Sequence, residues 1–159
     1  MDANPSLRRR PRAGFTLIEL MITLVILGVL SAMAGPSFVG LIAGQRGKSI
    51  TSDLFTALTK ARSEAIKRNT EVTLAPGASG AWKDGWSIAN PADASQKLYD
   101  HGPIPEATIT GPANVAYHGN GRLRGNAEPS FDITVRGADK HYCVQLDLSG
   151  RPLMKSSGC

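Results

Sequence analysis

The chain has 159 residues, which suits one compact domain with an additional segment, and 42% of its residues are hydrophobic. Its formal net charge is +5, but four arginines and one aspartate in the first 14 residues already account for +3 of this. Because little positive charge remains for the rest of the chain, the high pI does not by itself indicate a nucleic-acid-binding head. Arginines at this position are typical of the cytoplasmic flank of a membrane segment.

Residues 15–34 form an apolar run that predicts a helix about 30 Å long, enough to span the hydrocarbon core of a bilayer. One alternative is a secretory signal peptide, for which residues 32–34 (AMA) would be the cleavage site. Glu19 lies inside the run, and a carboxylate at membrane depth costs about 2.5–3.5 kcal/mol. A signal peptide gains nothing from this charge, whereas a helix that later packs against other chains gains a partner for it.

Residues 12–20 (RAGFTLIEL) closely resemble the type III signal of type IV pilins and type II secretion pseudopilins. The resemblance implies that a prepilin peptidase cleaves between Gly14 and Phe15 and methylates the new amino group, so that residues 1–14 are a leader peptide. It also implies that Glu19 pairs with the amine of a neighbouring subunit in the low-dielectric filament core. Replacing Glu19 by Leu or Ala is then expected to leave membrane insertion intact and to impair incorporation.

Five small or helix-breaking residues follow the apolar run. Proline removes a backbone donor and kinks a helix, and glycines weaken it. We therefore expect the assembly helix of residues 15–36 to continue into a bent, partly melted stretch. The residues concerned are Gly35, Pro36, Gly40, Gly44 and Gly47.

An amphipathic pattern begins at Ser49 and predicts a helix that ends near Arg68-Asn69. The helical continuation is thus expected to cover residues 37–69 and to pack one face on a sheet. The apolar residues of that face are Ile50, Leu54, Leu58, Ala61 and Ala65.

Short alternating segments separated by Gly and Pro follow Thr70 and predict β-strands. Residues 137–140 and 149–150 are expected to be hairpin turns. The expected fold is α+β: a long, hydrophobic, pilin-like N-terminal helix whose C-terminal half packs on a small antiparallel β-sheet head of residues 70–159. The expected strands cover residues 71–74, 86–89, 97–99, 107–110, 115–117, 131–136, 142–148 and 152–155.

The chain has two cysteines, Cys143 and Cys159. Export to an oxidising compartment favours a disulfide between them, and the hairpin through residues 149–150 would bring Cys159 back along the strand that holds Cys143. Two free thiols in a cytosolic protein are the alternative.

Three further segments resemble the GspH/FimT branch of the pilin-like family: residues 61–65 (ARSEA), 82–86 (WKDGW) and 150–151 (GR). This implies a minor pilin or pseudopilin that assembles into a type II secretion pseudopilus or a type IV pilus, in protein secretion or pilus biogenesis. The implied partners are prepilin peptidase, other pilin or pseudopilin subunits and an inner-membrane assembly platform. The implied location is the bacterial inner membrane, as a single-pass protein with a periplasmic head, and then the filament.

A DNA-binding minor pilin acting in natural transformation is the alternative function. Some FimT-type proteins bind DNA through a Gly-Arg-x-Arg element near the C-terminus. Residues 121–124 (GRLR) have this pattern, whereas residues 150–153 (GRPL) lack its second arginine. The candidate DNA-binding residues are Arg122, Arg124, Arg136, Arg151 and Lys155.

The sequence has no recognisable catalytic set. Its three histidines are scattered without metal-ligand spacing, and it has no G-x-S-x-G nucleophile elbow. We therefore expect no enzymatic activity, no cofactor and no metal site. The two tryptophans are expected to be core or hairpin-packing residues.

Overall fold

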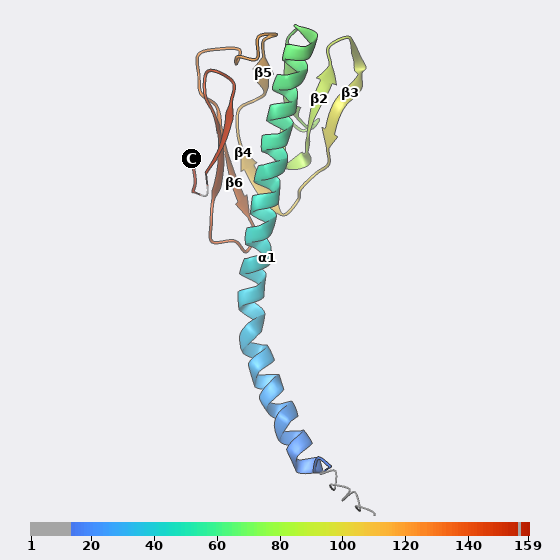
Figure 1. Ribbon diagram of the computed structural model, residues 1–159, viewed down its shortest axis with the longest axis vertical. Coiled ribbons are helices and arrows are strands. Elements are labelled where there is room, and N and C mark those ends of the chain that lie inside the picture. Colours follow the sequence, from blue (N-terminus) through green and yellow to red (C-terminus); the bar gives the residue numbers. More distant parts are fainter. Residues whose placement is uncertain (1–13, 156) are drawn as a thin grey trace, which may run out of the picture. The chain divides into compact units, whose positions relative to one another are not determined.

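The structure is a computed structural model that describes residues 14–155 and 157–159 (Figure 1). It divides into two compact units, which comprise residues 1–36 and 37–159. One helix, α1 (Leu17–Arg68), contributes to both units, and the β-strands all belong to the second. Among the described residues, no helix combines the length and the hydropathy that a membrane-crossing segment needs.

The C-terminus of α1 is fixed by its last turn. Asn69 takes a left-handed conformation with φ of 48°. The amide of Asn69 donates to Ile66, and the amide of Thr70 donates to Ala65, both at 3.2 Å. These are the two hydrogen bonds of a Schellman cap, which satisfies carbonyls that the helix leaves free. The helix therefore ends where the sequence predicts.

The expectation of a partly melted stretch is wrong. α1 is helical through residues 35–47. Gly47 lies directly against the Tyr142 ring, and the Tyr142 hydroxyl donates to the carbonyl of Gly44 at 2.9 Å. These glycines allow an aromatic side chain to approach the helix backbone, and they do not loosen it.

The β-strands form two four-stranded antiparallel sheets, where the sequence led us to expect one. The first sheet has the order β3-β2-β1-β5, and the second has the order β4-β6-β7-β8. A short 3-10 helix, η1 (Trp82–Asp84), precedes β2. The strands are β1 (Val72–Pro76), β2 (Trp86–Asn90), β3 (Asp93–His101), β4 (Ala107–Thr110), β5 (Val115–Tyr117), β6 (Ser130–Val135), β7 (Tyr142–Leu146) and β8 (Pro152–Lys155).

The predicted hairpins are present. β6 pairs with β7 across residues 136–141, and β7 pairs with β8 across residues 147–151. One hydrophobic cluster joins the apolar face of α1 to both sheets. Burying a side chain such as Leu54 or Leu58 contributes about 1.5–3 kcal/mol, so this face fixes the second half of α1 on the sheets.

Both tryptophans belong to the core, as predicted. Trp82 and Trp86 are almost fully buried. Trp82 packs edge-to-face on Phe131 with ring centroids 4.8 Å apart, and its indole nitrogen donates to the carbonyl of Pro112 at 2.7 Å. Trp86 stacks on His101 at 4.1 Å. Packing in the core therefore explains the presence of both tryptophans without a ligand-binding role.

Candidate functional site

The N-terminus of α1 is closed by a capping box. The amide of Glu19 donates to the Thr16 hydroxyl at 3.3 Å, and the amide of Thr16 donates to the Glu19 carboxylate at 3.5 Å. This reciprocal arrangement satisfies two amides that a helix start leaves free. The T-x-x-E spacing was visible in the sequence, but we interpreted Glu19 only as an assembly carboxylate. Gly14 and Phe15 precede this cap, and the Phe15 side chain is 82% exposed.

The first half of α1 presents apolar side chains to the solvent. From Leu17 to Leu30, its large hydrophobic side chains are each more than half exposed. A helix that is hydrophobic on all sides is stable only when other chains or lipid cover it. This segment is thus incomplete by itself. The remainder of the predicted leader, residues 1–13, lies outside the described residues.

The two cysteines form a disulfide in the structure. Cys143 of β7 is bonded to Cys159, with the Cα atoms 5.2 Å apart. The amide of Cys159 also donates to the Asp132 carboxylate of β6 at 3.4 Å. The last residues are thereby held to β7 and β6 of the second sheet.

The five candidate DNA-binding residues do not all lie together. β6 pairs with β7 at Ser130↔Gln145, and β7 pairs with β8 at Leu146↔Pro152, so Arg151 lies near the start of β6. Arg136 follows the last residue of β6, and a six-residue strand is about 20 Å long. These two arginines are therefore at opposite ends of the sheet.

Several of these cations already have partners. Arg151 pairs with Asp147 at 3.3 Å, and Arg124 pairs with Glu71 at 3.0 Å. Lys155 donates to the side chain of Gln145 at 2.6 Å. A hydrogen bond from the Ser149 hydroxyl, together with the contacts of Arg151, lowers the pKa of Asp147 to about 2. Asp147 therefore stays anionic and offsets the charge of Arg151.

Arg62 of α1 joins two loops of the head. Its Nε donates to the carbonyl of Gly121 at 3.0 Å, and its Nη2 donates to the carbonyl of Ser149 at 3.1 Å. The turn before Arg122 and the turn before Arg151 are thus fixed to the same helix. The sequence could not reveal this contact, because its partners lie 59 and 87 residues away.

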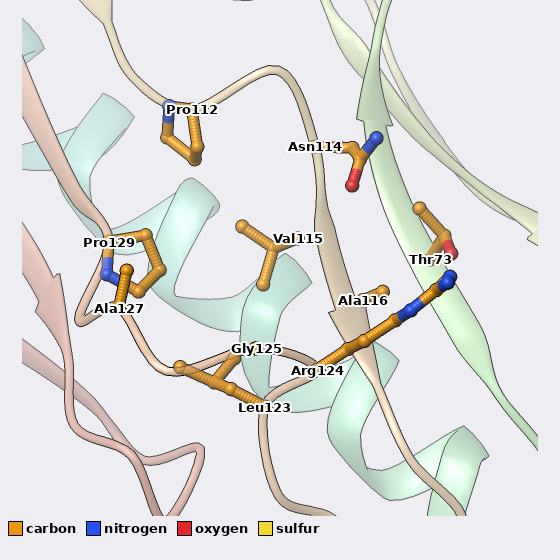
Figure 2. A pocket seen from close by; sticks show the side chains of 10 residues that line it. All are labelled: Thr73, Pro112, Asn114, Val115, Ala116, Leu123, Arg124, Gly125, Ala127 and Pro129. Atoms are coloured by element: carbon orange, nitrogen blue, oxygen red, sulfur yellow. The ribbon is translucent and has the colours of Figure 1, made fainter.

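A cavity of about 470 Å³ opens beside β5. Figure 2 shows the Arg124 side chain extending from the β5–β6 connection towards Thr73 of β1, with Asn114 at the same end. The other walls are apolar. The residues that form them are Pro112, Val115, Leu123, Ala127 and Pro129.

The three histidines each contact neighbouring residues of the head. His101 lies 3.7 Å from Asp53 and against Trp86, and His141 lies 3.1 Å from Asp132. The backbone amide of His118 donates to Arg122 in the turn after β5. Within residues 14–155 and 157–159, no group of three or more His, Cys, Asp or Glu residues is arranged to hold a metal ion.

Two family models match the chain. The model of the type II transport protein GspH matches residues 51–150, and that of the prokaryotic N-terminal methylation motif matches residues 9–35. The first match covers the second part of α1 and most of both sheets. The second covers the capping box and the exposed apolar part of the helix.

Two crystal structures of the type IV minor pilin FimU of Pseudomonas aeruginosa PAO1 have a similar fold. The structure in space group P21 has a TM-score of 0.61 and 21% identity, and covers 70% of this chain and 89% of FimU. The structure in space group P65 has a TM-score of 0.59 and 22% identity, and covers 68% and 91%. At this identity the likeness establishes the shared fold.

Proposed function

This chain belongs to the family of the type II transport protein GspH, and we propose that it is a minor pilin or pseudopilin that assembles into a type II secretion pseudopilus or a type IV pilus. Residues 12–20 predicted the pilin-like family, residues 61–65, 82–86 and 150–151 predicted its GspH/FimT branch, and the strand pattern predicted the α+β fold. Both machines use subunits of this design, so either remains compatible with the chain.

One observation carries the proposal: the match to the methylation motif extends into a capped helix whose apolar side chains are exposed. A helix of this kind needs neighbours, and in a filament the helices of other subunits supply them. The motif implies processing by a prepilin peptidase and assembly with other pilins. We infer that cleavage falls between Gly14 and Phe15, that Phe15 is methylated, and that Glu19 pairs with the amine of a neighbouring subunit.

The motif and the family indicate a membrane-anchored component of a periplasmic pilus or pseudopilus. We further propose a single pass through the inner membrane by residues 15–36, with a periplasmic head and contact with an inner-membrane assembly platform. The Cys143–Cys159 disulfide supports an oxidising location for the head, since such bonds persist in the periplasm and are rare in the cytosol.

The family and fold are those of structural pilin subunits, and we propose a structural role without catalysis. The DNA-binding alternative is not favoured. Tight phosphate binding needs several cations on one surface, whereas Arg136 and Arg151 lie at opposite ends of a sheet. Arg124 and Arg151 are also paired with carboxylates.

The test is a cross-linking pull-down of the processed protein from detergent-solubilised inner membrane, with the partners identified by mass spectrometry. Recovery of secretion pseudopilins would assign the chain to the type II system, and recovery of pilus subunits would assign it to type IV pili. The same spectra report whether the N-terminus is methylated Phe15. An uncleaved N-terminus without pilin-like partners would refute the proposal.

A further inference from the structure

The connection between β5 and β6 first runs along the edge of the first sheet and then leaves that sheet. After the turn at residues 118–121, the chain runs back beside β5, with Tyr117 bridged to Leu123. The amide of His118 donates to Arg122, and the amide of Arg124 donates to the carbonyl of Ala116, both at 2.9 Å. These contacts add one isolated β-bridge to the outer edge of β5 in the first sheet.

The bridged segment ends at Gly125, whose φ of 103° directs the chain away from β5. The carbonyl of Ala116 points to this outer side, and in a β-strand the amide of a residue points to the same side as its carbonyl. The Ala116 amide and the backbone of Asn114 therefore face the space that the chain vacates. That space is the cavity beside β5. The cavity thus combines an open strand edge with apolar walls.

The two ends of the cavity differ in polarity. Val115 and Leu123 form an apolar floor, and both are nearly fully buried. The guanidinium of Arg124 lies at the opposite end, towards Thr73 (Figure 2). It uses only Nη1 for its pair with Glu71. A guanidinium has five N–H donors, so most of those of Arg124 stay available. The Arg124–Glu71 pair is also exposed, and such pairs hold their geometry weakly.

Two other outer edges in this head, those of β8 and β3, are protected against pairing. β8 is four residues long and begins with Pro152, which has no amide to donate, and it ends with Lys155. β3 carries charged side chains and a bulge in its pairing with β2. Prolines, lysines and bulges are the means by which sheet proteins prevent strand addition. The edge beside Asn114 is flanked by an apolar cavity instead.

We propose that this edge binds an extended segment of a neighbouring filament subunit, with an apolar side chain in the cavity and a carboxylate on Arg124. Residues two apart in a strand project from the same face, so the segment would have the pattern apolar-x-Asp/Glu. Its backbone would pair with Ala116 and Asn114, as in other cases of strand addition. The inference rests on the proposed function, since it names a contact between subunits.

The test uses the full-length chain in cells that assemble the filament, with the photo-reactive residue p-benzoylphenylalanine at the exposed position Asn114. A second sample carries it at Leu24, on the apolar part of α1. We expect one subunit to be cross-linked from Asn114. Arg124→Glu should reduce that yield by about tenfold or more, since like charges in an interface cost several kcal/mol. Ala127→Trp, which fills the apolar end from an exposed position, should reduce it as well.

Arg136→Glu is the matched control, because it makes the same charge change at an exposed arginine outside the cavity. Formation of the disulfide on a non-reducing gel reports that each variant folds. If Leu24 gives subunit adducts but Asn114 gives none, or if Arg124→Glu behaves as Arg136→Glu, the docking site is refuted and the proposed function stands. If neither position gives subunit adducts and the chain is absent from filaments, the proposed function itself is refuted.

Discussion

Gly47 allows the Tyr142 ring to rest on the backbone of α1. A Cβ atom at Gly47 would lie 2.8 Å from Cδ2 and 3.1 Å from Cζ of that ring, which is closer than van der Waals contact permits. The ring has little room to move, because Tyr142 is 4% exposed and its hydroxyl is bound to the carbonyl of Gly44. Gly47→Ala should therefore displace Tyr142 and destabilise the head.

Two opposing effects set the magnitude. Alanine is favoured over glycine inside a helix by about 1 kcal/mol. Overpacking costs about 1–3 kcal/mol, and the loss of the Tyr142 hydrogen bond costs about 1 kcal/mol more. The net expectation is a loss of about 1–3 kcal/mol in the free energy of unfolding. Gly40→Ala is the matched control, because its Cβ would meet nothing closer than the carbonyl of Gly137 at 3.9 Å.

The assay is urea unfolding of residues 37–159, the compact unit that contains both sheets, with the free energy extrapolated to water. Gly40→Ala should raise the free energy of unfolding by about 0.5–1 kcal/mol, and Gly47→Ala should lower it. Equal gains in both variants would refute the reasoning, since they would mean that helix propensity alone decides the effect at Gly47.

Three further outcomes follow from the described contacts. Cys159→Ser should lower the free energy of unfolding by about 3 kcal/mol in the chain-entropy treatment for a separation of 16 residues, and reduced wild type should match it in urea unfolding. The hydrogen bond from Ser149 lowers the pKa of Asp147 in the folded state to about 2. The stabilisation by its carboxylate is therefore present above the ordinary aspartate pKa of 3.8 and disappears as the pH falls towards 2. Asp147→Asn should make the midpoint of unfolding less dependent on pH over that window. Glu19→Gln removes the charge but keeps a side chain that can complete the capping box, so helix formation and membrane insertion should persist. Incorporation into the filament, measured by subunit cross-linking, should fall. Incorporation equal to that of the wild type would exclude the charge pairing.

Local patterns predicted the strands well where apolar alternation is bounded by Gly or Pro. β4, β5 and β8 have the expected bounds, and β6 and β7 differ by one or two residues at their ends. β3 is longer than expected, because its first residues are polar and exposed and are held by backbone pairing with β2. A strand that buries few side chains has no hydrophobic period to detect.

The contacts that position the site were beyond local patterns. The division into two sheets, the junction of two loops on Arg62 and the fit of Gly47 against Tyr142 all depend on residues far apart in the chain. The structural effect of a glycine in a helix depends on the residue that packs against it, and the sequence alone does not identify that residue. The cavity beside β5 likewise exists only because the chain leaves the sheet at Gly125.

The capping box connects the fold of α1 with its proposed assembly. Glu19 is three residues after Thr16, a spacing that brings its carboxylate back over the free amides of the first helical turn. Cleavage after Gly14, as proposed, would create a cationic amine at Phe15, next to Thr16 and hence near the same carboxylate. The amine of its own chain and that of a neighbour would then compete for Glu19. In water, the exposed Glu19 carboxylate attracts the amine of its own chain only weakly. Burial in a filament strengthens the attraction between the carboxylate and the amine that is excluded from solvent with it. Assembly would thus convert a marginal helix cap into a strong contact between subunits, and this conversion requires the charge that Glu19→Gln removes.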